Sequence, residues 1–308
     1  MEWQQILGFY HVARLGNFTR AAEATFRTQS ALSQQVKALE KELDCLLFER
    51  IGKRKLQLTP AGEELLRFSE EILEKRDRLA QSLNSLKGIQ KGPLKIAAPF
   101  TTLYHLFPEI LKAYVEQFPH VQLTILDRPQ RKVIELVKRG DIDFGLAIES
   151  SAPRDLVLRR WVKVETVLMT PIGHPLTAER QVTLNDIVKY PLILPPKSPE
   201  YSSRLELEER LRDLGVVYHV IMESSNVDLS SVYVEMGLGV AFATVVRDLP
   251  ILKQRKLEFI SLSHYFEPDY VSLVTRKNRD LPLYKSAFAD MILSGQRSSQ
   301  QSLLQDLT

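Results

Sequence analysis

The sequence predicts an α+β multidomain protein: a small helical domain, then a long linker helix, then a two-lobed α/β domain. The chain has 308 residues, more than one hydrophobic core usually organises. Apolar residues recur with a helical period near the N-terminus, with a seven-residue period over residues 65–86, and in alternating strand and helix patterns from Leu94 onward. We expect boundaries at 1–59, 60–88 and 93–295, with a disordered Ser- and Gln-rich tail at 296–308.

The composition is that of a soluble globular protein, with 44% hydrophobic and 26% charged residues. Apolar runs such as Val240–Ala243 are too short to span a bilayer, and residues 1–5 lack the features of a secretion signal. The single cysteine, Cys45, excludes an intramolecular disulfide and fits a reducing cytosol. The histidines are scattered without ligand spacing. We therefore expect a cytoplasmic protein with no membrane segment, metal or cofactor.

The small positive charge is concentrated at the N-terminal end. Residues 1–60 hold nine basic and six acidic side chains, so this segment accounts for the whole formal net charge of +3. Such an asymmetry favours a polyanionic partner for the first domain.

The helix expected at residues 29–43 has two distinct sides. Leu32, Val36, Leu39 and Leu43 form one apolar stripe at helical spacing. Amide, hydroxyl and ammonium side chains lie off that stripe, which suits the reading of base edges in the major groove of DNA. A merely solvated helix face is the alternative. Shorter helices are expected at residues 3–15 and 19–25, with a tight connection at 26–28.

A basic hairpin is expected after this helix. Two short extended segments, residues 47–50 and 56–59, flank a tip that contains Gly52 and three consecutive cations at 53–55. Such a wing would lie along phosphates or in the minor groove, although a solubilising turn would have the same composition. Arg50 is expected to make a structural ion pair or a phosphate contact rather than to read a base.

The linker helix is expected to begin at Pro60, with Thr59 as its N-cap, and to end near Lys87. Leucine or isoleucine recurs every seven residues at 65, 72, 79 and 86. A repeat of this length predicts a coiled-coil seam between two chains.

The remaining sequence predicts a doubly wound α/β domain. Strands at 94–98, 121–126 and 143–148 alternate with helices at about 103–117 and 130–139, and a second set follows from residue 165. Lobe I is expected at about 93–162 and 265–295, and lobe II at about 163–264. Gly237 and Gly239 lack the third glycine of a dinucleotide fingerprint and lie between a helix and a strand, so a Rossmann site is rejected.

The motifs together resemble the LysR-type transcriptional regulators. The resemblance extends over nearly the whole chain and is most specific in residues 18–23, 28–40, 47–50 and 58–62, with further similarity at 140–143 and 237–241. It implies a winged helix-turn-helix, a linker helix and a periplasmic-binding-protein-like effector domain. It also implies a homodimer or homotetramer that binds a dyad-symmetric promoter site in double-stranded DNA, responds to a small-molecule effector and acts on RNA polymerase.

The resemblance, together with the side-chain chemistry, nominates two sets of site residues. The residues expected to contact DNA are Arg27, Gln29, Ser30, Ser33, Gln34, Lys37, Arg50, Lys53 and Arg54. The residues expected to contact a small polar or anionic effector are Thr101, Thr102, Leu103, Gln130, Ile148, Ser202, Ser203 and Thr244. Thr101 and Thr102 would precede a helix whose N-terminal amides favour an anion.

Other functions fit the sequence less well. An enzyme would need a catalytic motif, and neither a nucleophile elbow, a metal motif nor a phosphate loop is present. A solute-binding protein would need a secretion signal and would not use the basic helices. An architectural DNA binder would not need the lobed half of the chain. Effector identity, target genes, the sign of regulation and the choice between dimer and tetramer stay open.

Overall fold

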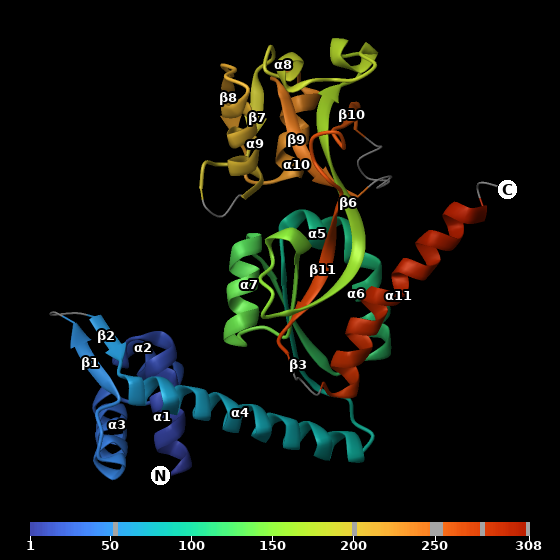
Figure 1. Cartoon of the computed structure of the whole chain (residues 1–308). Helices are drawn as coiled ribbons and strands as arrows, with labels where there is room; N and C mark the ends of the chain where they lie inside the picture. Colours follow the sequence, from blue (N-terminus) through green and yellow to red (C-terminus); the bar gives the residue numbers. More distant parts are fainter. Residues whose placement is uncertain (52–54, 199–201, 247–254, 278–280, 306–308) are drawn as a thin grey trace. The chain divides into compact units, whose positions relative to one another are not determined.

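The computed structural model describes the whole chain except residues 52–54, 199–201, 247–254, 278–280 and 306–308; it also leaves the side chains of 50, 51, 55, 85, 202, 203 and 295–305 undescribed. The chain forms two compact units, Met1–Ile89 and Gln90–Thr308 (Figure 1).

The first unit packs three helices, a β-hairpin and a long helix around one core. In order these are α1 (Trp3–Leu15), α2 (Phe18–Ala24), α3 (Gln29–Leu43), β1 (Phe48–Ile51), β2 (Lys55–Leu58) and α4 (Pro60–Leu86). The Asn17 side chain caps α2 by accepting hydrogen bonds from two backbone N–H groups. The Thr28 side chain caps α3 by accepting a hydrogen bond from one backbone N–H group. Leu32, Val36 and Leu39 of the apolar stripe of α3 are buried in one core with Phe9 and Val12 of α1, whereas Leu43 at the end of the stripe is 40% exposed.

The start of α4 is held tightly against the base of the hairpin. Thr59 Oγ1 accepts a hydrogen bond from Gly62 N at 3.0 Å and donates one to Leu46 O at 2.6 Å. A Cβ at Gly62 would lie 2.1 Å from Leu47 O, so only glycine allows this approach. The predicted N-cap at Thr59 is confirmed.

The second unit has two lobes built on one continuous path of strands, in the order β4-β3-β5-β11-β6-β9-β7-β8, with β10 paired to β6. The strands are β3 (Gly92–Ala98), β4 (Val121–Asp127), β5 (Phe144–Ile148), β6 (Val157–Pro171), β7 (Leu192–Leu194), β8 (Val220–Glu223), β9 (Val240–Val245), β10 (Leu257–Ser261) and β11 (Asp269–Thr275). The helices are α5 (Phe100–Leu106), α6 (Pro108–Gln117), α7 (Gln130–Arg139), α8 (Leu184–Ile187), α9 (Ser202–Asp213), α10 (Val227–Glu235) and α11 (Leu283–Gln305), with 3₁₀ turns η1 (Glu149–Ser151) and η2 (Pro175–Ala178).

Strand β6 belongs to both lobes. Its first half, Val157–Val164, pairs with β11 in lobe I. Its second half pairs with β9 and β10 in lobe II. Figure 1 shows β6 running from one lobe to the other, so the two lobes are joined through this strand.

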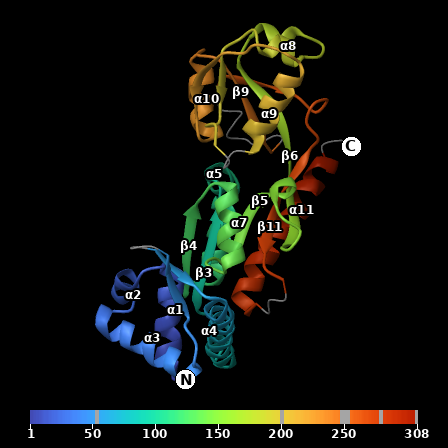
Figure 2. The same ribbon diagram turned by 60° about the vertical axis from the view of Figure 1, so that its left-hand side comes forward.

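Each lobe has its own core. Strand side chains alternate between the two faces of a sheet, so apolar side chains pack on both faces. In lobe I, Ile96 packs with α6 and α11 on one face, while Ala97 packs with α7 on the other. Figure 2 shows α7 and α11 on either side of this sheet. In lobe II, Leu192 of β7 and Leu211 of α9 belong to one cluster.

The structure differs from the sequence-based expectations in several places. The helix expected at 103–117 is two helices, α5 and α6, because Pro108 has no N–H to continue the first one. Strand β10 was not expected, since its sequence does not alternate cleanly. Helix α11 continues to Gln305 through the segment expected to be a disordered tail; no proline interrupts residues 296–305.

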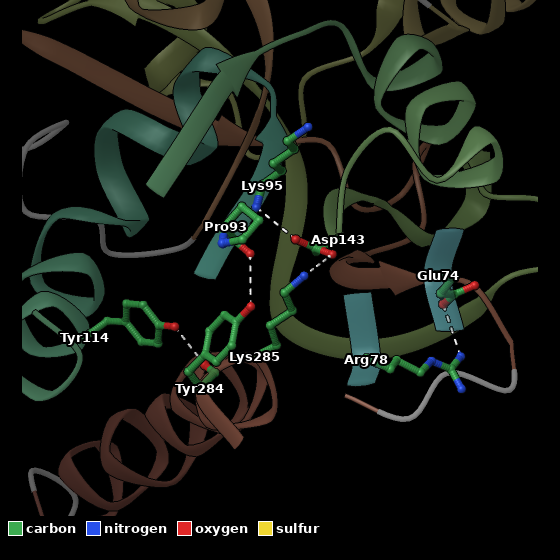
Figure 3. Close-up of polar contacts among 8 residues, drawn as sticks. All are labelled: Glu74, Arg78, Pro93, Lys95, Tyr114, Asp143, Tyr284 and Lys285. Atoms are coloured by element: carbon green, nitrogen blue, oxygen red, sulfur yellow. Dashed lines mark hydrogen bonds and ion pairs between the residues drawn. The ribbon is translucent and has the colours of Figure 1, made fainter. Parts of the chain in front are cut away.

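A buried ion pair anchors α11 to lobe I (Figure 3). Lys285 Nζ lies 2.8 Å from Asp143 Oδ1, and both side chains are buried. Asp143 Oδ2 also accepts a hydrogen bond from Lys95 N at 3.0 Å. In the same region Tyr114 donates to Tyr284 O. Asp143 therefore connects β3, the start of β5 and α11.

We predict that Lys285→Met lowers the unfolding free energy of this unit by about 3–5 kcal/mol, because it leaves the Asp143 carboxylate buried without its cation. Urea unfolding followed by the fluorescence of Trp161, which is buried in the lobe I core, measures the loss. Lys132→Met, in an ion pair whose side chains are 41% and 42% exposed, is the matched control and should cost less than about 0.5 kcal/mol. Equal losses in the two variants would show that the buried pair is not an anchor.

Candidate functional site

Helix α3 presents a polar face from a well-anchored position. Leu32, Val36 and Leu39 are buried, and Gln29, Ser30, Gln34 and Lys37 are exposed while Ser33 is half-buried. These residues are free of the local core and have the donors and acceptors that base edges and phosphates require. The structure thus brings the predicted α3 residues together on one side of the helix.

The connection before α3 is fixed by side-chain hydrogen bonds. Arg27 Nη1 donates to Gln35 Oε1 at 2.7 Å, and Nη2 donates to Gln4. These bonds tie α1 to α3 through the guanidinium. Arg27 therefore has a structural role here, and its contact with DNA stays a prediction.

The hairpin follows the expected wing. Strands β1 and β2 pair in antiparallel register, with Arg50 opposite Leu56. Lys53 and Arg54 lie outside the described residues, and the side chain of Arg50 is not described. Sequence reasoning missed Glu40, whose carboxylate accepts hydrogen bonds from Leu47 N at 2.9 Å and Phe48 N at 3.4 Å. Glu40 joins α3 directly to the base of the wing.

Helix α4 changes character along its length. Leu65 is buried in the core of the first unit. Farther along, Leu79 and Leu86 of the seven-residue repeat are 60% and 85% exposed, and Leu83 is also exposed. An apolar row of this kind on an exposed helix needs a partner surface.

A cleft of about 1110 Å³ lies in the second unit and is lined by residues of both lobes. Five of the predicted effector residues line it: Thr101, Thr102, Gln130, Ile148 and Thr244. Leu103 instead packs against the lobe I core, and its amide donates to the carbonyl oxygen of Pro99, the residue before α5. Ser202 and Ser203 begin α9, with side chains that are not described.

The elements that place these residues differ in part from the expectation. Thr101 and Thr102 lie inside the first turn of α5 rather than before it, because the helix begins at Phe100. They therefore offer hydroxyls to the cleft. Gln130, at the start of α7, accepts a hydrogen bond from Ile148 N at 3.0 Å, which ties α7 to the end of β5 at the crossing between lobes.

Sequence reasoning missed a buried charge network in lobe II. Arg204 lines the cleft; its Nε and Nη2 donate to Glu208 Oε1 at 2.9 and 2.7 Å. Burial by itself raises the pKa of Glu208, but hydrogen bonds from Arg204, Lys197 and Tyr218 outweigh it and lower the pKa to about 2. Glu208 therefore stays ionised and holds Arg204 at the wall of the cleft. The Arg-x-x-x-Glu spacing on one helix was the available signal.

Two contacts across the cleft were also missed. Asp228 of α10 lies within hydrogen-bonding distance of Thr101 and His105 of α5.

Among the residues that the structure describes, no group of three or more His, Cys, Asp or Glu side chains is placed to hold a metal ion. A search of the same residues for a membrane-crossing helix finds no segment with the required length and apolarity.

Comparisons with known proteins match both units. Residues 3–63 match the family model described as "Bacterial regulatory helix-turn-helix protein, lysR family", and residues 87–297 match that described as "LysR substrate binding domain".

Individual relatives extend over most of the chain. The HTH-type transcriptional regulator cbl of Escherichia coli is 29% identical over 96% of this chain and 93% of its own length. The HTH-type transcriptional activator CmpR of Synechocystis is 30% identical, with 77% of each chain covered. Among solved structures, a full-length OxyR variant from Pseudomonas aeruginosa has a TM-score of 0.64 at 24% identity, with 95% of this chain and 97% of that chain covered, and it shares the fold.

The relatives are regulators of transcription rather than enzymes. Regulators of this family bind DNA and small-molecule effectors. The chain belongs to the LysR family of bacterial transcription regulators, with a helix-turn-helix DNA-binding domain and an effector-binding domain.

Proposed function

We propose that the chain acts in the cytoplasm as a homo-oligomer that binds a dyad-symmetric promoter site and changes the access of RNA polymerase when a small molecule occupies the cleft. The observation that supports this most directly is the polar face of α3, which is largely exposed while Leu32, Val36 and Leu39 on the opposite side are buried. A separate lobed unit with a large cleft supports the sensing role.

For DNA binding, α3 enters the major groove. Gln29, Ser33 and Gln34 supply amide and hydroxyl groups for base edges, whereas Lys37 supplies a charge for phosphate. The wing residues Arg50, Lys53 and Arg54 would add phosphate contacts and affinity that is independent of sequence.

For assembly, two α4 helices pair along the row that contains Leu79, Leu83 and Leu86. Pairing would bury these exposed side chains and place two α3 helices on one duplex, so that the two-fold symmetry of the dimer matches that of the site. The same dimer could pair again as a tetramer.

For sensing, the effector would lie between the lobes against Thr101, Thr102, Gln130 and Thr244. Hydroxyl and amide groups at this site favour a small polar or anionic molecule. Ligand binding would favour one arrangement of the lobes, and its effect cannot exceed the difference in its affinity for the two arrangements.

Capture of sheared genomic DNA by the full-length protein at physiological salt, followed by sequencing, tests the proposed function. We expect enrichment of a few intergenic fragments that share an interrupted inverted repeat. Uniform retention that disappears as salt is raised would indicate non-specific phosphate binding and would contradict a promoter-specific regulator.

On a captured fragment, Gln34→Ala should lower affinity about 10-fold and relax sequence preference, because a lost amide pair with a base costs about 1–3 kcal/mol. Lys37→Met should weaken binding to all sequences and reduce the slope of log affinity against log salt by about one. Fluorescence anisotropy over a salt series measures both. Lys112→Met is the matched control, at an exposed position of α6 in the other unit. If this variant loses affinity as Lys37→Met does, the contact assigned to Lys37 is wrong.

Leu79→Asp should convert the oligomer into monomers at micromolar concentration, because it places a carboxylate in the apolar row of α4. Sedimentation velocity measures the change. Asp77→Lys is the control. It reverses a charge two residues away, on another side of α4 where the Asp77 side chain is 58% exposed, and it should leave the oligomer unchanged. An unchanged oligomer in Leu79→Asp would mean that α4 does not join the chains.

A further inference from the structure

The carboxylate of Asp228 in lobe II contacts two side chains of lobe I beside the cleft. Asp228 Oδ1 lies 2.6 Å from His105 Nε2, and Asp228 Oδ2 lies 3.3 Å from Thr101 Oγ1. Asp228 belongs to α10 in lobe II, whereas Thr101 and His105 belong to α5 in lobe I. Thr101 and Val227, which precedes Asp228, both line the cleft.

The two donors act as a pair because of their spacing. Thr101 and His105 are four residues apart on α5, so their side chains project from the same side of the helix. A carboxylate only accepts hydrogen bonds, so the proton in each bond comes from the threonine hydroxyl and from His105 Nε2. Together these donors meet the two oxygens of one carboxylate.

Burial makes the pair selective. The His105 side chain is 2% exposed and that of Asp228 is 22% exposed. A buried N–H donor that loses its acceptor is destabilised, so His105 requires an oxyanion or another acceptor at this position. The carboxylate of Asp228 thus shows which chemical group the two donors bind: an oxyanion.

The number of protons forces a competition. A threonine hydroxyl donates one hydrogen bond, and the N–H of His105 Nε2 also donates one. An effector oxygen that accepts from Thr101 must therefore replace Asp228 Oδ2. The negative charge of Asp228 would also repel an anionic group at the same place.

We propose that Thr101 and His105 form a two-donor oxyanion site that Asp228 occupies as an internal competitor. The effector carries a carboxylate, sulfate or phosphate group that displaces Asp228. This displacement exchanges a contact between the lobes for a contact with the ligand, so ligand binding releases α10 from α5. The inference rests on the proposed function only in taking the cleft as the effector site.

Titration calorimetry of inorganic sulfate into the full-length protein, with ionic strength held constant by sodium chloride, tests the competition. Asp228→Asn replaces the charged acceptor with a weaker neutral one, and it should bind sulfate about tenfold more tightly than the wild type. Asp213→Asn removes an exposed carboxylate of α9 in the same lobe and should bind sulfate as the wild type does.

Two double variants locate the gain. Adding Thr101→Val or His105→Phe to Asp228→Asn should abolish the tighter binding, because each removes one of the two donors. Sulfate affinity that is unchanged or weaker in Asp228→Asn, absent from every variant, or insensitive to the double substitutions would overturn the proposal.

The test separates this inference from the proposed function. Genomic DNA capture by the wild-type protein reports DNA recognition with the cleft contacts unchanged. Specific capture without a gain in sulfate affinity rejects the competition alone, whereas a gain in sulfate affinity without specific capture rejects the promoter-binding role alone.

Discussion

The second unit depends on one constraint: the lobes share strand β6. Because its residues pair with β11 in lobe I and with β9 and β10 in lobe II, the backbone hydrogen bonds of both sheets run through a single segment. Motion between the lobes must therefore bend or twist β6 where it passes from one lobe to the other. Gln130 and Ile148 lie beside this crossing, and the Asp228 contacts join α5 to α10 across the cleft. A ligand that replaced the Asp228 contacts would act directly on α5 and α10, which the shared strand does not hold together.

In the first unit, α3 exposes a polar face while its opposite side is held in the core. The stripe of α3 contributes Leu32, Val36 and Leu39 to the core, and Thr28 caps the helix at its N-terminus. Glu40 then fixes the base of the wing to α3. Helix α3 and the hairpin are thus positioned by one another, while Gln29, Ser30, Gln34 and Lys37, which are proposed to contact DNA, stay exposed.

Local patterns predicted the architecture well where one period dominates. The stripe of α3, the Thr59-Pro60 start of α4 and the first strands of lobe I all follow from spacing and capping chemistry. The sequence could not reveal contacts between distant segments. Asp228 is 123 residues from His105, Lys285 is 142 residues from Asp143, and neither spacing carries a local signal. The break of the 103–117 helix could have been predicted, since Pro108 stands in its interior, but the apolar period on both sides of it favoured one continuous helix.

Footprinting on a captured genomic fragment tests most directly whether cleft contacts control the way the protein occupies DNA. The full-length wild type and Asp228→Asn are compared at equal saturation. If release of α10 from α5 changes the arrangement of lobes and chains, the length of the protected region should differ between them, while the half-site sequence contacted by α3 stays the same. Identical footprints in length and pattern would contradict the coupling between the effector cleft and DNA binding.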